Sequence, residues 1–149
     1  MKNLVLIESI FRYLRYSEYL FLIAEVCPWI LSRDDWDFIS MEQKLSEDFI
    51  TKFQEHLDWE LISECQKLSE EFIDNFQDRV DWVCISMHQK LSEKFITKFQ
   101  DKIDWQCISG YQQLSEEFIT KFQERVDWER ISRLSFIPQA HNCRERGNS

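Results

Sequence analysis

The sequence predicts an all-α fold, a short α-solenoid of helix-turn-helix repeats with a helical N-terminal cap. The first observation is a 23-residue unit that opens with Asp-Trp and recurs in register. The second is that each full copy contains two apolar runs at the spacing of one helix face. The third is that the 149 residues include only two Gly and two Pro, well below average usage. Units of this kind stack on their neighbours to bury a continuous core.

The repeat divides the chain into three parts. We expect residues 1–34 to form the N-terminal helical cap from a degenerate repeat, and residues 35–131 to form the array. Residues 132–149 are expected to hold a truncated repeat and a disordered tail. The copies of the unit cover residues 35–57, 58–80, 81–103, 104–126 and, in part, 127–131.

The first residues also invite a second interpretation, a signal peptide, because Lys2 is followed by an apolar run. However, Glu8, Arg12 and Arg15 interrupt any apolar stretch of the usual length of about 7–15 residues. No stretch reaches the roughly 18 apolar residues that a membrane span needs. We therefore predict a cap, with no membrane partner and no secretion.

In the second copy, the first predicted helix begins after Asp58. Trp59, Ile62 and Gln66 follow at the spacing of one helix face. Asp58 suits an N-cap because its carboxylate can accept hydrogen bonds from the amides of the first turn. The equivalent residues of the other copies are expected to cap in the same way: Asp35, Asp81, Asp104 and Asp127.

The second predicted helix of the same copy begins after Ser69, another N-cap residue. Phe72, Ile73 and Phe76 make its apolar face, and Glu70 places negative charge in the first turn, where the helix dipole favours it. Isolated helices of this length are marginal in water. Each unit must therefore bury its aromatic and aliphatic residues against its neighbours.

Residues repeated in every copy point to structure, because a catalytic pair needs one special environment. We predict that the repeated Gln forms a hydrogen-bonding ladder between units: Gln43, Gln66, Gln89 and Gln112. The repeated Trp is predicted to lie in the core and not to form a stacking platform for bases or sugars: Trp36, Trp59, Trp82, Trp105 and Trp128. A net charge of −9 also argues against nucleic acid as a partner.

The five cysteines offer the next candidate chemistry. Cys84 and Cys107 share one repeat position, and packed helices lie about 8–10 Å apart, beyond the roughly 7 Å limit on the Cα separation in a disulfide. We expect reduced thiols, as in intracellular proteins, with no metal site and no cofactor. Cys65 and His88 both hold the eighth position of adjacent units, but no third group orients them. No enzymatic activity and no catalytic residue is predicted.

Positions that differ between copies are the candidate interaction surface. At about 100° per residue, the first helix directs its third, fourth, seventh and eighth positions away from the core. Many residues there are apolar, Cys84 and Cys107 included, and an exposed apolar strip usually marks an interaction site. The alternative is that short helices wedged between neighbours leave this side half-buried. The candidate partner-binding strip is Phe38, Met41, Leu61, Cys65, Val83, Met87, His88 and Tyr111.

The pattern DWxxIS…QKLSEEFI…FQDKVDW over residues 35–131 resembles a short tandem repeat of proteins from large nucleocytoplasmic DNA viruses, including the marseillevirus group, and from some phages and bacteria. The resemblance implies a viral protein in the host cytoplasm or the virion, with no assigned activity. We therefore expect a non-enzymatic scaffold that binds a viral or host protein. A second interpretation is a structural or virion component that forms homo-oligomers through the array ends, and a third is a cysteine-dependent enzyme.

Overall fold

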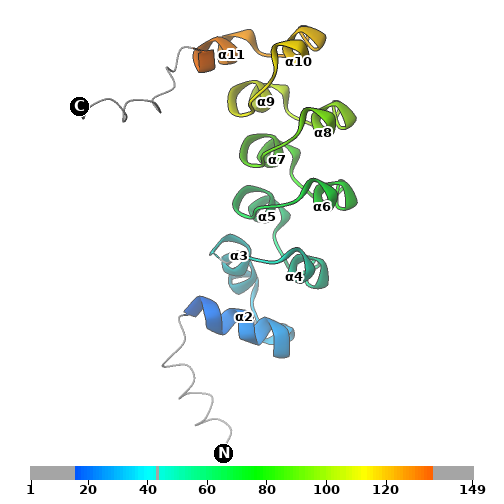
Figure 1. Cartoon of the computed structure of the whole chain (residues 1–149). Coiled ribbons are helices and arrows are strands. Elements are labelled where there is room, and N and C mark those ends of the chain that lie inside the picture. Colours follow the sequence, from blue (N-terminus) through cyan, green and yellow to red (C-terminus); the bar gives the residue numbers. More distant parts are fainter. Residues whose placement is uncertain (1–15, 43, 136–149) are drawn as a thin grey trace, which may run out of the picture.

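The protein is an elongated stack of short helices, seen in a computed structural model that describes residues 16–42 and 44–135. The described residues are helical and contain no strand, so the predicted short helical repeat solenoid is confirmed. Two rows of helices run along the stack (Figure 1). The first helices of the units are α3 (Arg33–Glu42), α5 (Trp59–Cys65), α7 (Trp82–His88), α9 (Trp105–Tyr111) and α11 (Trp128–Ser135). The second helices are α4 (Glu47–Lys52), α6 (Glu70–Asn75), α8 (Glu93–Lys98) and α10 (Glu116–Lys121).

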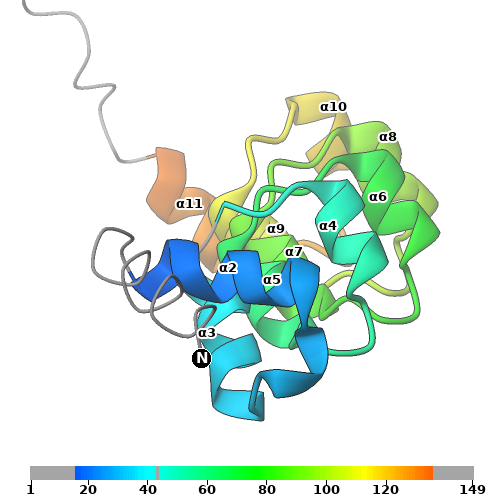
Figure 2. The ribbon, with the colours of Figure 1, turned by 90° about the horizontal axis from the view of Figure 1, so that it is seen from below.

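The N-terminal end of the stack is closed by α2 (Tyr16–Val26) and the 3₁₀ turn η1 (Pro28–Ile30). The helix α2 packs on α3 and crosses the end of the array when the molecule is viewed along the stack (Figure 2). Its Leu20 and Ala24 are buried in the common core. The helix α2 stops just before Pro28, because proline lacks the amide that continues a helix. The remainder of the predicted cap, residues 1–15, lies outside the described residues.

The predicted aspartate caps are present in the second to fifth copies. Asp58 accepts from the amides of Glu60 and Leu61 at 2.9 and 3.1 Å, and Asp81, Asp104 and Asp127 each accept from the amide three residues on.

Asp35 was predicted to cap in the same way, and that prediction is wrong. The helix α3 begins at Arg33, three residues before the Trp36 start that an Asp35 cap would give, with Ser32 before it. The Ser32 hydroxyl accepts from the Asp35 amide at 3.3 Å, and the Asp35 carboxylate accepts from the Ser32 amide at 2.9 Å. This reciprocal arrangement is a capping box. The first copy can start early because no preceding second helix occupies the residues before it.

Each second helix is capped as predicted and buries the same face. Ser69 accepts from the Phe72 amide at 3.1 Å, and Ser46, Ser92 and Ser115 make the equivalent bond. Ile73 is fully buried and Phe72 nearly so. The helices are only six residues long, so this burial against neighbouring helices, and not intrinsic propensity, stabilises them.

A buried serine ties each unit to the next. Ser63 on α5 is fully buried; its hydroxyl donates to the Trp59 carbonyl at 2.7 Å and accepts from the Asp81 amide of the following unit at 3.0 Å. The same pair of bonds recurs at Ser40, Ser86 and Ser109. One hydroxyl thus satisfies two buried backbone groups, which explains why the unit opens with DWxxIS.

The predicted glutamine ladder is confirmed. Gln89 accepts from the Leu68 amide at 3.1 Å and donates to the carbonyls of Ser63 and Gln66 in the preceding unit at 3.0 and 2.7 Å. Gln112 repeats all three bonds one unit later, and Gln66 bonds back to Leu45 and Ser40. These bonds pair backbone amides and carbonyls of the connector between the two helices of a unit, which the hydrogen bonds within either helix do not reach. Gln43 lies outside the described residues.

The tryptophan series departs from the prediction of core residues. Trp36 is buried, but Trp59, Trp82 and Trp105 are half-buried at the edge of the core and Trp128 is exposed. Each half-buried ring leans on the two Phe of its own unit, as Trp82 does on Phe95 and Phe99 at 6.5 and 5.0 Å between centroids. Its indole N–H donates to a carbonyl of the preceding unit, Gln77 for Trp82 at 2.9 Å. The polar edge thus keeps the ring at the surface.

At the C-terminal end, α11 replaces the partial copy predicted over residues 127–131. It continues to Ser135 and packs on α9. Residues 136–149, which include most of the predicted truncated repeat and tail, lie outside the described residues.

Deleting residues 81–103 should leave a folded, shorter array with a lower melting temperature. Val80 then joins Asp104, Ser63 can accept from the Asp104 amide, and Gln112 can replace Gln89. Solenoid stability is approximately a sum of unit and nearest-neighbour contributions. Deleting residues 81–91 instead removes α7 but keeps α8, so we expect that protein to unfold. Urea denaturation of both variants checks this, and equal loss of structure would contradict modular units.

Replacing Gln89 should destabilise the fold although the side chain carries no charge. Gln89→Ala leaves the Leu68 amide and the Gln66 carbonyl buried without a partner, which costs about 1–3 kcal/mol per group. Gln113→Ala removes an exposed glutamine and should change the free energy of unfolding by no more than about 0.5 kcal/mol. Equal urea midpoints for the two variants would show that the glutamine ladder contributes nothing to stability.

Candidate interaction surface

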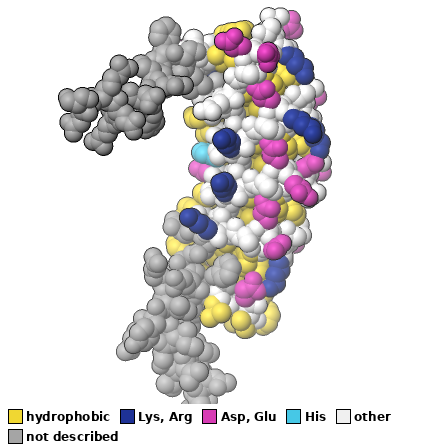
Figure 3. Space-filling model, viewed as in Figure 1, with side chains coloured by type: hydrophobic (Ala, Val, Ile, Leu, Met, Phe, Trp, Pro, Cys, Tyr) yellow, Lys and Arg dark blue, Asp and Glu magenta, His cyan; other side chains and the backbone are white. Residues whose placement is uncertain are grey.

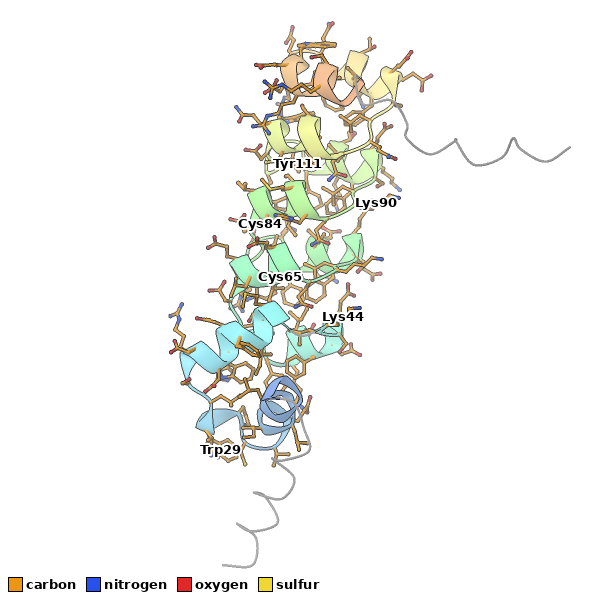
Figure 4. The ribbon with its side chains drawn as sticks, turned by 90° about the vertical axis from the view of Figure 1, so that its left-hand side faces the viewer. Trp29, Lys44, Cys65, Cys84, Lys90 and Tyr111 are labelled. Carbon is orange, nitrogen blue, oxygen red and sulfur yellow. The ribbon has the colours of Figure 1, made fainter. Side chains whose placement is uncertain are left out.

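The predicted partner-binding strip follows the row of first helices, and part of it is exposed. Met41, Val83 and Tyr111 are 45, 48 and 57% exposed, and Cys65 and His88 are also exposed. Figure 4 shows Cys65, Cys84 and Tyr111 on successive helices of this row. We call Met41, Cys65, Val83, His88 and Tyr111 the exposed strip. Its residues differ from unit to unit, so its chemistry changes along the stack.

The remaining strip residues do not face solvent fully. Phe38, Leu61 and Met87 are half-buried, as is Cys84, and Cys107 is buried. The expectation that Cys107 points away from the core is therefore wrong. The fourth position of the first helix packs toward adjacent first helices, which lie closest to one another in the stack. An estimate of about 100° per residue places this position outward on a single helix but cannot account for a neighbour above or below it.

A row of lysines runs beside the exposed strip, and sequence reasoning did not single it out. Lys44, Lys67 and Lys90 occupy the same position in the connector between the two helices of their units, and all are exposed. Figure 4 shows Lys44 and Lys90 on the side of this face that is nearer to the second helices. Among the described residues, none of these lysines forms an ion pair. The sequence does show the lysine repeated at this position in the first three copies, with Gln113 in its place in the fourth.

Other charges are paired between units. Arg79, Lys102 and Arg125 share one repeat position and bind an acid of the preceding unit: Glu55, Asp78 at 2.9 Å and Asp101 at 3.0 Å. The hydrogen bond and the charge of Arg79 hold the pKa of Glu55 below its usual range. Figure 3 shows acidic and basic side chains interspersed along one face of the stack. These exposed pairs contribute little stability individually. They do, however, give Arg79, Lys102 and Arg125 an acidic partner within the stack, which the lysine row does not have.

Two cysteines on the first helices, Cys84 and Cys107, have thiols with raised pKa values. Burial, followed by the hydrogen bond to Asp81, raises the pKa of the Cys84 thiol to about 12. Burial and the hydrogen bond to Asp104 also raise the pKa of Cys107. The described cysteines form no disulfide, as predicted; Cys143 lies outside the described residues. A thiol reacts as the thiolate, so neither Cys84 nor Cys107 is an activated nucleophile.

The predicted Cys65–His88 pair is brought to exposed positions on adjacent first helices. Two shallow hollows of about 470 and 530 Å³ lie near the ends of the stack, the first beside Trp36 and His56 and the second beside Tyr111 and Arg130. Neither of these two hollows is lined by Cys65 or His88.

The described residues contain neither a metal-binding cluster nor a membrane-spanning helix. Within residues 16–42 and 44–135, no group of three or more His, Cys, Asp or Glu side chains is arranged to hold a metal ion. None of the helices described there combines the length and the apolar character that crossing a membrane requires. His141 lies outside this part of the chain.

The comparisons with known proteins assign no family. No protein-family model matches the chain, and neither a curated protein nor a solved structure does so. The surface chemistry of the repeat is therefore the evidence on function.

The thiols provide a direct check of the geometry of this row. Native protein treated with iodoacetamide at pH 8 should be alkylated at Cys65 at least tenfold faster than at Cys84, because a pKa near 12 leaves a thiolate fraction on the order of 10⁻⁴. Peptide mapping by mass spectrometry gives the rates. In urea all sites should react alike. Equal native rates at Cys65 and Cys84 would contradict the burial described here.

Proposed function

We propose that the protein is a non-enzymatic helical repeat scaffold that binds another protein along its row of first helices. The observation that carries the proposal is the exposed strip, which places Met41, Val83 and Tyr111 along the row of first helices. Surface patches of large apolar residues are typical of interaction sites, and methionine and tyrosine suit adaptable and amphipathic contacts. The repeated residues, by contrast, are occupied by bonds within and between units.

The lysine row indicates the kind of partner. Lys44, Lys67 and Lys90 are cations without an ion pair in the described part of the chain, in a protein whose net charge is −9. A partner segment that carries acidic residues beside apolar ones complements both features, because charge complementarity orients an interface while buried aromatics supply affinity. We propose an extended or helical acidic segment that lies along the stack.

The resemblance to repeats of large DNA viruses supports a viral setting for this proposal. A viral or a host protein is then the partner, and the host cytoplasm or the virion is the location that we propose. Lysate of infected host cells is accordingly the material in which to measure binding.

One observation favours the second candidate, a self-associating structural component. The N-terminal end exposes large apolar side chains: Leu22, Val26, Trp29 and Ile30. Trp29 is 77% exposed, and Figure 4 shows it at the end of the stack. A second copy that covers this end would make a homo-oligomer through the array end. Light scattering at micromolar concentration separates the candidates, because Trp29→Ala should convert such an oligomer to a monomer and leave a monomeric scaffold unchanged.

Binding through the exposed strip should respond to two kinds of substitution. Tyr111→Ala removes an exposed aromatic and should weaken capture of the partner by about 2 kcal/mol, the scale of an aromatic hot spot. Lys67→Glu with Lys90→Glu should weaken it several-fold and more strongly at low salt. Quantitative mass spectrometry of proteins captured by each immobilised variant gives the measurement.

The matched control changes the same charge on the other row of helices. Lys94 and Lys121 are exposed on α8 and α10, so Lys94→Glu with Lys121→Glu has the same net charge as the test variant. This control should retain the captured proteins. Equal loss in both charge variants would attribute capture to net charge alone, and the proposed surface would be wrong.

A further inference from the structure

The C-terminal end of the array differs from its interior because no second helix follows α10 in the described chain (Figure 1). Ile50, Ile73 and Ile96 are fully buried, whereas their counterpart Ile119 is only half-buried. Glu47, Glu70 and Glu93 are half-buried, whereas Glu116 is exposed. The four copies have the same residues at these positions. The difference in burial therefore shows which part of α10 a following second helix would cover.

The interior of the array shows what the face of a second helix binds. Glu47 accepts from the Ser69 amide of the next unit at 2.6 Å, Glu70 from Ser92 at 2.5 Å and Glu93 from Ser115 at 2.6 Å. Among the described residues, Glu116 has no such amide. Glu124 is in the same situation, because its counterparts Glu55, Asp78 and Asp101 each bind a cation of the following unit.

Trp128 extends the same incomplete interface. Its indole N–H donates to the Gln123 carbonyl at 3.0 Å, as Trp105 does to Gln100 at 2.9 Å, so the ring is held in the position used throughout the array. Trp105 packs on Phe118 and Phe122 of its own second helix at 6.4 and 5.0 Å between centroids. Trp128 has no second helix in the described chain, and 55% of its surface is exposed.

The Leu114 amide at this end also lacks the glutamine acceptor that its counterparts have. The amides of Leu45, Leu68 and Leu91 each donate to the glutamine side chain of the following unit. Ser135 stands where the fifth copy would place that glutamine, and the Leu114 amide has no counterpart bond within the described residues. The backbone of α11 already fills this glutamine position, so an apolar patch and the two acids Glu116 and Glu124 are what this end offers to a further helix.

We propose that this end of the array is a binding site for one further second helix, supplied in trans by another polypeptide. The interior interfaces define its pattern as Ser-x-x-Phe-x-x-x-Phe-x-x-Lys/Arg. The serine amide serves Glu116, the two Phe pack on Trp128, and the cation pairs with Glu124. The partner is another chain that carries this repeat pattern on an unpaired helix.

The described second helices of another copy of this protein do not meet that condition. On α4, α6, α8 and α10 the first Phe of the pattern is already buried in its own chain: Phe49, Phe72, Phe95 and Phe118. The site also differs from the exposed strip, which lies on the first helices and selects an acidic segment. The two proposals can therefore fail independently.

A peptide with the sequence of residues 89–103, QKLSEKFITKFQDKI, is the probe because it satisfies every position of the pattern. Fluorescence polarisation of the labelled peptide against the full-length protein should show saturable binding. The same peptide with Phe95→Ala and Phe99→Ala should show at least tenfold weaker binding. Absence of binding by the unmodified peptide at millimolar protein, or equal binding by the Phe variant, would overturn the proposal.

Variants of the protein locate the site. Trp128→Ala should weaken peptide binding at least tenfold, and it should fold normally because the ring is more than half exposed. Glu124→Lys should weaken binding several-fold, and a peptide with Lys102→Glu should recover that loss on the Glu124→Lys protein but not on the unmodified one. This charge swap assigns the contact independently of any effect on folding.

Glu117→Lys is the matched control, because it makes the same charge change on α10 at a position where the third copy naturally carries Lys94. It should leave peptide affinity within twofold. A loss at Glu117→Lys equal to that at Glu124→Lys, or peptide binding unaffected by Trp128→Ala, would show that the peptide binds elsewhere and would overturn the assignment of the site.

Discussion

The structure depends on two buried polar side chains in each unit, one serine and one glutamine. Helices of six or seven residues leave most of their backbone groups without an intrahelical partner, and burying such groups unpaired is costly. Ser63 and Gln89 supply the missing partners across the boundary between units. Because each side chain bonds to the backbone and not to a variable side chain, the spacing of the units is set independently of what the surface carries. The apolar core of Ile and Phe then packs at that spacing.

This arrangement separates the residues that build the stack from those available for other roles. The repeated Asp, Ser, Gln, Phe and Ile are occupied within the array, and the inter-unit ion pairs occupy one series of cations. Exposed apolar residues that vary between units lie on the first helices, as Val83 and Tyr111 show, and the lysine row lies in the connectors. A scaffold of this kind can change its partner by substitutions at a few exposed positions, since those positions contribute little to stability.

The two ends of the stack are chemically different, although they terminate the same repeat. At the N-terminal end, α2 buries Leu20 and Ala24 against the array, and Glu25 forms an ion pair with Lys52 on α4. At the C-terminal end, α11 packs on α9, whereas α10 keeps Ile119 and Glu116 uncovered. Within the described residues, the row of first helices is thus the one that continues at the C-terminal end. Solenoids need terminal caps because an interior unit exposes its stacking face when it comes last.

The sequence by itself determined the helical class, the two capped helices of each unit, the glutamine ladder and the absence of a Cys84–Cys107 disulfide, because cap, spacing and repetition are local signals. It did not determine how much of each first helix is covered. Cys107 is buried and Phe38 is half-buried. The indole N–H of Trp59 donates to the Gln54 carbonyl at the edge of the core, and Asp35 lies in the first turn of α3, where it is the capping-box partner of Ser32 and not the N-cap. The resemblance to viral repeats and the choice of partner remain predictions. Exposure was decided only by the tertiary structure, because it depends on the distance and angle between units, and a helical periodicity describes one helix without its neighbours.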